Sequence, residues 1–129
     1  APLTMLGLNL THQVRMGQVH ADECRALDTP VAEAMAGLLE FYAVFHLAAE
    51  EVADGPVHDP CAVLAVTHPD LFQMEDRPVH VELSGTHTRG MTLVDERGPQ
   101  ADTPTNCRVA YRVASGAVVD LIMQAVREA

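Results

Sequence analysis

The feature that most constrains the fold is a short, almost wholly apolar run at the start of the chain, from Leu3 to Leu10. Such a run is typical of a strand buried on both faces, as in a parallel sheet, although its pattern alone does not distinguish it from a buried helix. A buried parallel strand needs parallel neighbours on its flanks, and the rest of the sequence shows no second strand of this kind. We therefore expect the chain to be only part of a larger fold.

Helix signals follow the apolar run. Thr29-Pro30 is typical of an N-cap followed by proline at the first helical position, and it predicts a helix that runs to about Glu50. Asp22 predicts the cap of a shorter helix before it, and Ser115 predicts the cap of a closing helix at the end of the chain. These helices account for much of the apolar residue content.

Strand signals lie in the second half of the sequence. Apolar and polar residues alternate over 79–83, and a second strand is expected over 91–94, so the two predict a β-hairpin. Alternation returns over 109–113 and predicts a further strand. The expected fold class is α/β, with one parallel strand, several helices and an antiparallel hairpin as an annex, in one domain or part of one over residues 1–129.

Composition excludes several function classes. The chain has 129 residues, of which 48% are hydrophobic, and its formal net charge is −10. It has no lysine, which excludes Schiff-base chemistry, and its eight arginines are scattered among eighteen carboxylates, so we expect no nucleic-acid partner. The longest mostly apolar stretch, Ala34 to Ala49, contains Glu40 and His46 and is shorter than the ~20 residues of a membrane span, so we expect no membrane partner.

The cysteines indicate the compartment. Cys24, Cys61 and Cys107 are odd in number and widely spaced, and none forms a CxxC pair. A zinc site or a disulfide framework is therefore not expected, and we predict buried free thiols in a cytoplasmic protein.

The most informative segment is Val57-His58-Asp59-Pro60-Cys61-Ala62-Val63. In a structural interpretation, Asp59 caps a short helix and His58 is incidental. In a functional interpretation, the carboxylate of Asp59 binds a hard cation and the imidazole of His58 handles a proton near neutral pH. Calcium takes about six to eight oxygen ligands, so this second interpretation requires further acidic ligands, and the sequence contains no DxDxDG loop to supply them.

Three segments together carry a resemblance to a known family. Residues 57–63 resemble the C-terminal signature of the inosine-uridine-preferring nucleoside hydrolases, and the opening residues 3–13 resemble another segment of that family. The hairpin residues 81–85 and 88–92 are similar to a third segment. The likeness covers essentially the whole chain but only about the last two-fifths of a family domain. It implies the C-terminal part of a Rossmann-like nucleoside hydrolase fold.

The resemblance implies a chemistry. The family hydrolyses the N-glycosidic bond of purine and pyrimidine ribonucleosides, giving ribose and a free base, with calcium bound to the ribose hydroxyls and the attacking water. Asp59 resembles the family's C-terminal calcium ligand, and His58 resembles the histidine implicated as general acid for the departing base. The family's N-terminal aspartate cluster is absent from this sequence. We therefore expect the chain alone to be inactive.

Other interpretations stay open at this point. His46 lies four residues after Tyr42 on the long predicted helix and is a candidate to line a substrate pocket. The chain could instead be an inactive remnant that serves as a binding or oligomerisation module, or an unrelated α/β domain without a site. The resemblance implies a small-molecule nucleoside substrate and a homo-oligomer, either a dimer or a tetramer. Base preference does not follow from the sequence.

Overall fold

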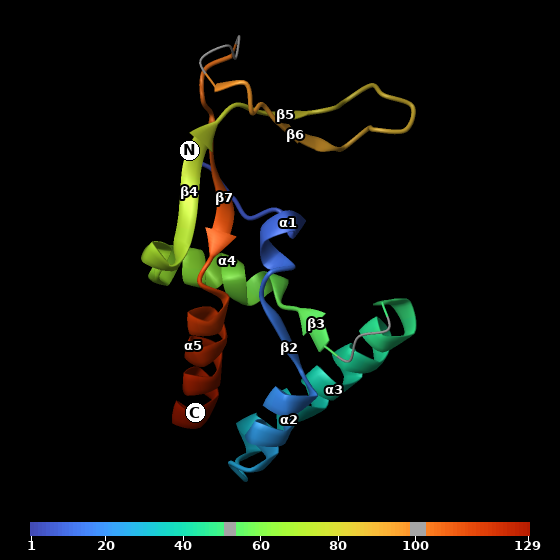
Figure 1. Ribbon diagram of the computed structural model, residues 1–129, viewed down its shortest axis with the longest axis vertical. Coiled ribbons are helices and arrows are strands. Elements are labelled where there is room, and N and C mark those ends of the chain that lie inside the picture. Colours follow the sequence, from blue (N-terminus) through green and yellow to red (C-terminus); the bar gives the residue numbers. More distant parts are fainter. Residues whose placement is uncertain (51–53, 99–102) are drawn as a thin grey trace.

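Helices lie between the strands in the first half of the chain, four strands follow one another in the second half, and the strands of the described residues form one three-stranded and two two-stranded sheets (Figure 1). The computed structural model describes residues 1–50, 54–98 and 103–129, with the backbone alone at 45 and 47–50. The described elements follow in this order: β1 (Thr4–Met5), α1 (Leu8–Thr11), β2 (Arg15–Gly17), α2 (Gln18–Arg25), α3 (Pro30–Glu50), β3 (Asp54–Pro56), α4 (His58–Thr67), a 3-10 turn (Pro69–Leu71), β4 (Phe72–Arg77), β5 (Val79–Val81), β6 (Thr92–Val94), β7 (Cys107–Val113) and α5 (Ser115–Glu128).

Strand β7 lies at the centre of the largest sheet, between β1 and β4. β1 runs parallel to β7, with Thr4 paired to Arg108, and β4 runs antiparallel to it, with Arg77 paired to Cys107. The prediction of a parallel strand near the start of the chain is therefore confirmed. The expectation that the chain holds no parallel neighbour for it is wrong, because β7 is that neighbour.

The apolar run at the start of the chain is divided between a strand and a helix. β1 ends at Met5, and α1 begins after Gly7, whose carbonyl accepts the backbone N–H groups of Leu10 and Thr11 at 3.0 and 3.1 Å. Leu10 is fully buried, whereas Leu8 is exposed. A run that buries only part of its side chains can fold as a helix turn, so the prediction of one strand over Leu3 to Leu10 is wrong beyond Met5.

The first residues of α3 and α2 can be compared with the N-caps that the sequence predicts. α3 begins at Pro30 as predicted, and the Thr29 hydroxyl accepts the backbone N–H of Ala32 at 3.2 Å. α2 begins at Gln18 rather than at Asp22, because the ring of His20 accepts the backbone N–H of Gly17 at 3.1 Å and closes the first turn earlier.

The closing helix also begins differently from the prediction. Ala114 is the N-cap of α5, and its carbonyl accepts the N–H of Val118 at 3.1 Å. Ser115 is therefore already inside the helix and does not cap it. Although α3 has 21 residues, the described parts of the chain contain no helix that is both long and apolar enough to cross a membrane.

Strands β2 and β3 form a short antiparallel ribbon that the sequence did not predict. The guanidinium of Arg15 donates to the Asp54 carboxylate at 2.6 Å and to the Asp54 carbonyl at 3.0 Å. Gly55 and Pro56, which we interpreted as a helix break, are two of the three β3 residues. The ribbon places the following residues, the start of α4, beside the end of α1 (Figure 1).

The hairpin prediction is confirmed. β5 and β6 pair antiparallel, with Val79 opposite Val94, and Figure 1 shows them extending away from the helices. The Glu82 carboxylate accepts the backbone N–H groups of Ser84 and Gly85 at 2.8 and 3.0 Å. These hydrogen bonds lower the pKa of Glu82 and hold the start of the turn.

In the described parts of the chain, the core forms two buried clusters. One joins β2, α2, α3 and α5 around Met16, Leu39 and Met123, and the other joins α1, α4, β4, β7 and α5 around Leu10 and Phe72. Val57, Val119 and Ile122 pack against both clusters. Because Val57 directly precedes His58, the backbone that carries the candidate site is held from two sides.

Candidate active site

The β3–α4 junction carries the signature segment. Val57 is the N-cap of α4, without a side-chain cap, and α4 begins at His58. Pro60 is tolerated there because the first-turn N–H groups of a helix have no intrahelical partner. The interpretation of Asp59 as the helix cap is therefore wrong: Asp59 lies one residue inside the first turn and is exposed to solvent.

His58 is half-buried against the end of α1. Its Nδ1 lies 2.8 Å from the Thr11 hydroxyl oxygen, and its ring centroid lies 5.5 Å from that of His12 in a tilted arrangement. The backbone N–H of Val57 donates to the carbonyl of Val14 at 2.9 Å. These three contacts fix the position of His58 relative to the end of α1 and the residues after it.

Asp59 supplies a carboxylate at the N-terminal turn of α4, where the helix dipole favours a negative charge. A carboxylate oxygen is the kind of ligand that calcium prefers. The described residues contain no group of three or more histidine, cysteine, aspartate or glutamate side chains arranged to hold a metal ion. The donor type at Asp59 therefore suits calcium, but the described part of the chain does not complete a calcium site.

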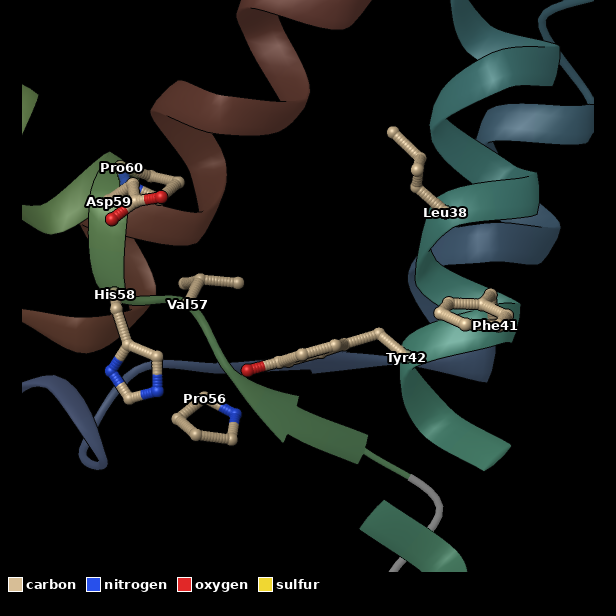
Figure 2. Close-up of a pocket in the computed structure, with 8 residues that line it drawn as sticks. All are labelled: Leu38, Phe41, Tyr42, Pro56, Val57, His58, Asp59 and Pro60. Atoms are coloured by element: carbon tan, nitrogen blue, oxygen red, sulfur yellow. The ribbon is translucent and has the colours of Figure 1, made fainter. Parts of the chain in front are cut away.

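His58 and Asp59 line a hollow of about 430 Å³ between α3 and the β3–α4 junction. We call it the His58 hollow. In Figure 2 the Tyr42 ring extends from α3 toward the junction, with its hydroxyl on the side of Pro56 and His58. Of the residues that the structure describes, the lining contains Leu38, Phe41, Tyr42, Pro56, Val57, His58, Asp59 and Pro60. The hollow thus combines apolar walls with a few polar groups, as is usual for a small-molecule site.

His46 lies one helical turn beyond Tyr42 on α3. Its side chain is 9% exposed, and its ring meets the Tyr42 ring edge-on with centroids 4.5 Å apart. A Cβ atom on Gly55 would lie 2.6 Å from carbon atoms of both rings, so only glycine lets β3 approach α3 this closely. His46 is not among the described residues that line the hollow, whereas Tyr42, which its ring contacts, is one of them.

The three cysteines are free and buried, which confirms that prediction. The Cys61 thiol donates to the Val57 carbonyl at 3.0 Å, and burial raises the pKa of that thiol. Cys61 is fully buried and packs in the core beneath the junction.

The sequence motif contains both His58 and Asp59, but it does not indicate that Thr11 and Tyr42 lie beside them. Thr11 is 47 positions from His58, and no local pattern connects them. Tyr42 carried one usable signal, because it lies four residues before His46 and so on the same face of α3.

Comparisons with known proteins show the family to which the chain belongs. Residues 1–120 match the family described as inosine-uridine preferring nucleoside hydrolase, and the chain belongs to that family. The pyrimidine-specific ribonucleoside hydrolase RihA of Shewanella woodyi is 34% identical over 124 residues, which are 95% of this chain and 39% of the relative. RihA of Photobacterium profundum is 36% identical over 95% of this chain and 40% of its own length.

A solved structure shows the same architecture. The purine-preferring ribonucleoside hydrolase from Gardnerella vaginalis superimposes with a TM-score of 0.87 at 26% identity, covering 99% of this chain and 40% of that chain. The predicted class, part of a nucleoside hydrolase fold, is therefore confirmed. The chain spans about two-fifths of the length of the relatives that it matches.

Proposed function

We propose that the chain is the C-terminal portion of a calcium-dependent ribonucleoside hydrolase, which cleaves the N-glycosidic bond of a nucleoside to give ribose and free base. Family membership supports the reaction class. The observation that carries the site assignment is the placement of His58 and Asp59 side by side on one wall of the His58 hollow. An imidazole can give a proton near neutral pH, and a carboxylate suits a hard cation.

The proposed role of His58 follows from the charges that develop in the reaction. The transition state resembles an oxocarbenium ion at the sugar, while the base leaves with negative charge. Nδ1 of His58 is already engaged by Thr11, so Nε2 is the nitrogen that would donate a proton to the leaving base. The proton moves from Nε2 to the base as the N-glycosidic bond breaks.

Asp59 is proposed as one ligand of calcium, which when bound would hold the ribose hydroxyls and the attacking water. The remaining ligands and the general base would come from residues outside this chain, because one carboxylate cannot supply the oxygens that calcium takes. We therefore expect the isolated chain to bind calcium weakly and to turn over no nucleoside.

A second candidate function is a binding or oligomerisation module without catalysis. Leu38 and Phe41 on α3 are 65% and 78% exposed, and Val63 and Val66 on α4 are 62% and 82% exposed. Exposed large apolar side chains of this kind can be buried against another polypeptide. A second copy of the chain is the partner we would test first, in line with the expected homo-oligomer.

Nucleoside hydrolysis separates the two candidates. Inosine and uridine hydrolysis is measured for the isolated chain and for the complete product of its reading frame, with and without a calcium chelator. We expect activity in the complete protein alone, its loss with chelator and its return with calcium. A complete protein that binds itself but hydrolyses neither nucleoside, with calcium present, would favour the non-catalytic module.

A further inference from the structure

Thr11 is a buried hydroxyl residue at the end of α1 whose backbone is already engaged. Its N–H donates to the Gly7 carbonyl at 3.1 Å, and its carbonyl accepts the N–H of Val14 at 3.1 Å. The residue is 3% exposed, so water does not compensate for a missing partner of the hydroxyl. Its hydroxyl oxygen lies 2.8 Å from Nδ1 of His58.

The segment that carries Thr11 is itself fixed to the β3–α4 junction. The carbonyl of Val14 accepts the N–H of Val57 at 2.9 Å. The hydroxyl of Thr11 and the carbonyl of Val14 therefore hold consecutive residues of the junction, His58 and Val57. We call this pair of contacts the α1 clamp. The backbone hydrogen bond keeps the Thr11 hydroxyl within reach of the imidazole, and the hydroxyl contact selects the orientation of the ring.

We infer that Thr11 is the positioning residue of His58 and directs Nε2 toward the His58 hollow. Whichever partner donates in the Thr11–His58 hydrogen bond, Nδ1 is occupied and Nε2 is the nitrogen that meets a ligand. In Figure 2 the two ring nitrogens lie on opposite sides of the imidazole, and one of them is on the side of Pro56. A rotation of the ring by half a turn would break the contact with Thr11 and exchange these sides.

This inference deepens the proposed function, since a proton donor acts only from the correct side of its ring. A hydrogen bond to a functional histidine from a neighbouring residue is a common way to fix its orientation. Thr11 touches no substrate in this arrangement and acts through His58 alone. The effect of its loss should thus fall on turnover and not on binding.

Nuclear magnetic resonance on the isolated chain tests the geometry without any need for activity. Thr11→Val removes the hydroxyl and keeps the shape, Thr11→Ser keeps the hydroxyl, and Thr67→Val removes a hydroxyl at the far end of α4 as a matched control. We expect Thr11→Val to shift the Nδ1 resonance of His58. We also expect new through-space contacts between the protons of a rotated His58 ring and its neighbours. Thr11→Ser and Thr67→Val should retain the original pattern.

The orientation inference is overturned if Thr11→Val leaves the Nδ1 resonance and the ring-proton contacts as they are in the original chain. Should that variant fail to fold, Thr11→Ala gives the same two readouts. In the complete enzyme we expect Thr11→Val to lower kcat for inosine about ten-fold with KM changed less than about two-fold, and Thr11→Ser to restore most of kcat. Equal kcat values in all variants would overturn the link to turnover. A complete protein with no hydrolysis would instead contradict the proposed function, while the resonance result would stand.

Discussion

Gly55 offers a direct test of how closely β3 is packed on α3. In Gly55→Ala the new methyl carbon would lie 2.6 Å from Cδ2 of His46 and 2.6 Å from Cδ1 of Tyr42. Carbon atoms pack best at about 3.5–4.0 Å, so the strand or the rings must move by roughly 1 Å. His46 is buried, which limits the movement of its ring.

Overpacking of this kind costs about 1–3 kcal/mol of the free energy of unfolding. Gly37→Ala is the matched control, because its methyl group would meet no atom within 4 Å and Gly37 lies in the exposed middle of α3. Alanine is favoured over glycine inside a helix by about 0.5–1 kcal/mol, so this control should be slightly more stable than the original chain. Both variants replace glycine by alanine, but we expect one to lower the free energy of unfolding and the other to raise it.

Urea denaturation of the isolated chain measures both effects. We expect a lower midpoint for Gly55→Ala and a higher one for Gly37→Ala, with unchanged slopes, since a change of midpoint alone reports stability. A Gly55→Ala chain as stable as the original would refute the close approach of β3 to Tyr42 and His46. It would also remove the reason for glycine at this position.

Three further outcomes concern individual side chains. In the complete protein, His58→Ala should lower kcat for inosine by about 10²–10⁴-fold, with the exposed His87→Ala as control; an unchanged kcat would exclude His58 as the proton donor. Asp59→Asn should weaken calcium binding by about ten-fold or more in titration calorimetry, and equal affinity would exclude it as a ligand. Burial and the hydrogen bond to Glu96 raise the pKa of Tyr111 to about 12. Folding therefore favours the neutral phenol of Tyr111. The stabilisation that this residue gives to the folded chain is complete below the ordinary pKa of tyrosine and is lost as pH rises through about 12. In ultraviolet titration Glu96→Gln should lower the Tyr111 midpoint, and no change would contradict this cause.

Local signals predicted the elements whose determinants lie within a few residues. Thr29-Pro30 opens α3 because the threonine hydroxyl accepts an N–H three residues later. The hairpin was visible because alternation and a polar turn are adjacent in the chain. The predictions of Asp22 and Ser115 as N-caps are wrong because groups before them in the chain close the first helical turn. These groups are the His20 ring in α2 and the Ala114 carbonyl in α5. The position of a cap depends on which group reaches the N–H first.

The remaining errors come from distant contacts. β2 and β3 each have three residues, too few for a visible alternation, and they exist because Arg15 meets Asp54 across the ribbon. The parallel partner of β1 lies about a hundred positions away, where no local pattern indicates it. His58 and Asp59 were found because they are adjacent in a recognisable segment, whereas Thr11 was not linked to them because its partner is 47 positions away.

The α1 clamp has a consequence for how the site is assembled during folding. The contact closes a loop of 47 positions, which costs chain entropy, so the imidazole is oriented only when the end of α1 has docked on the start of α4. A synthetic peptide covering residues 54–67 would therefore contain His58 and Asp59 but lack the Thr11 hydroxyl that contacts the imidazole. The orientation of the imidazole therefore depends on the docked first residues of the chain as much as on the signature segment, because Thr11 supplies the hydrogen bond to Nδ1.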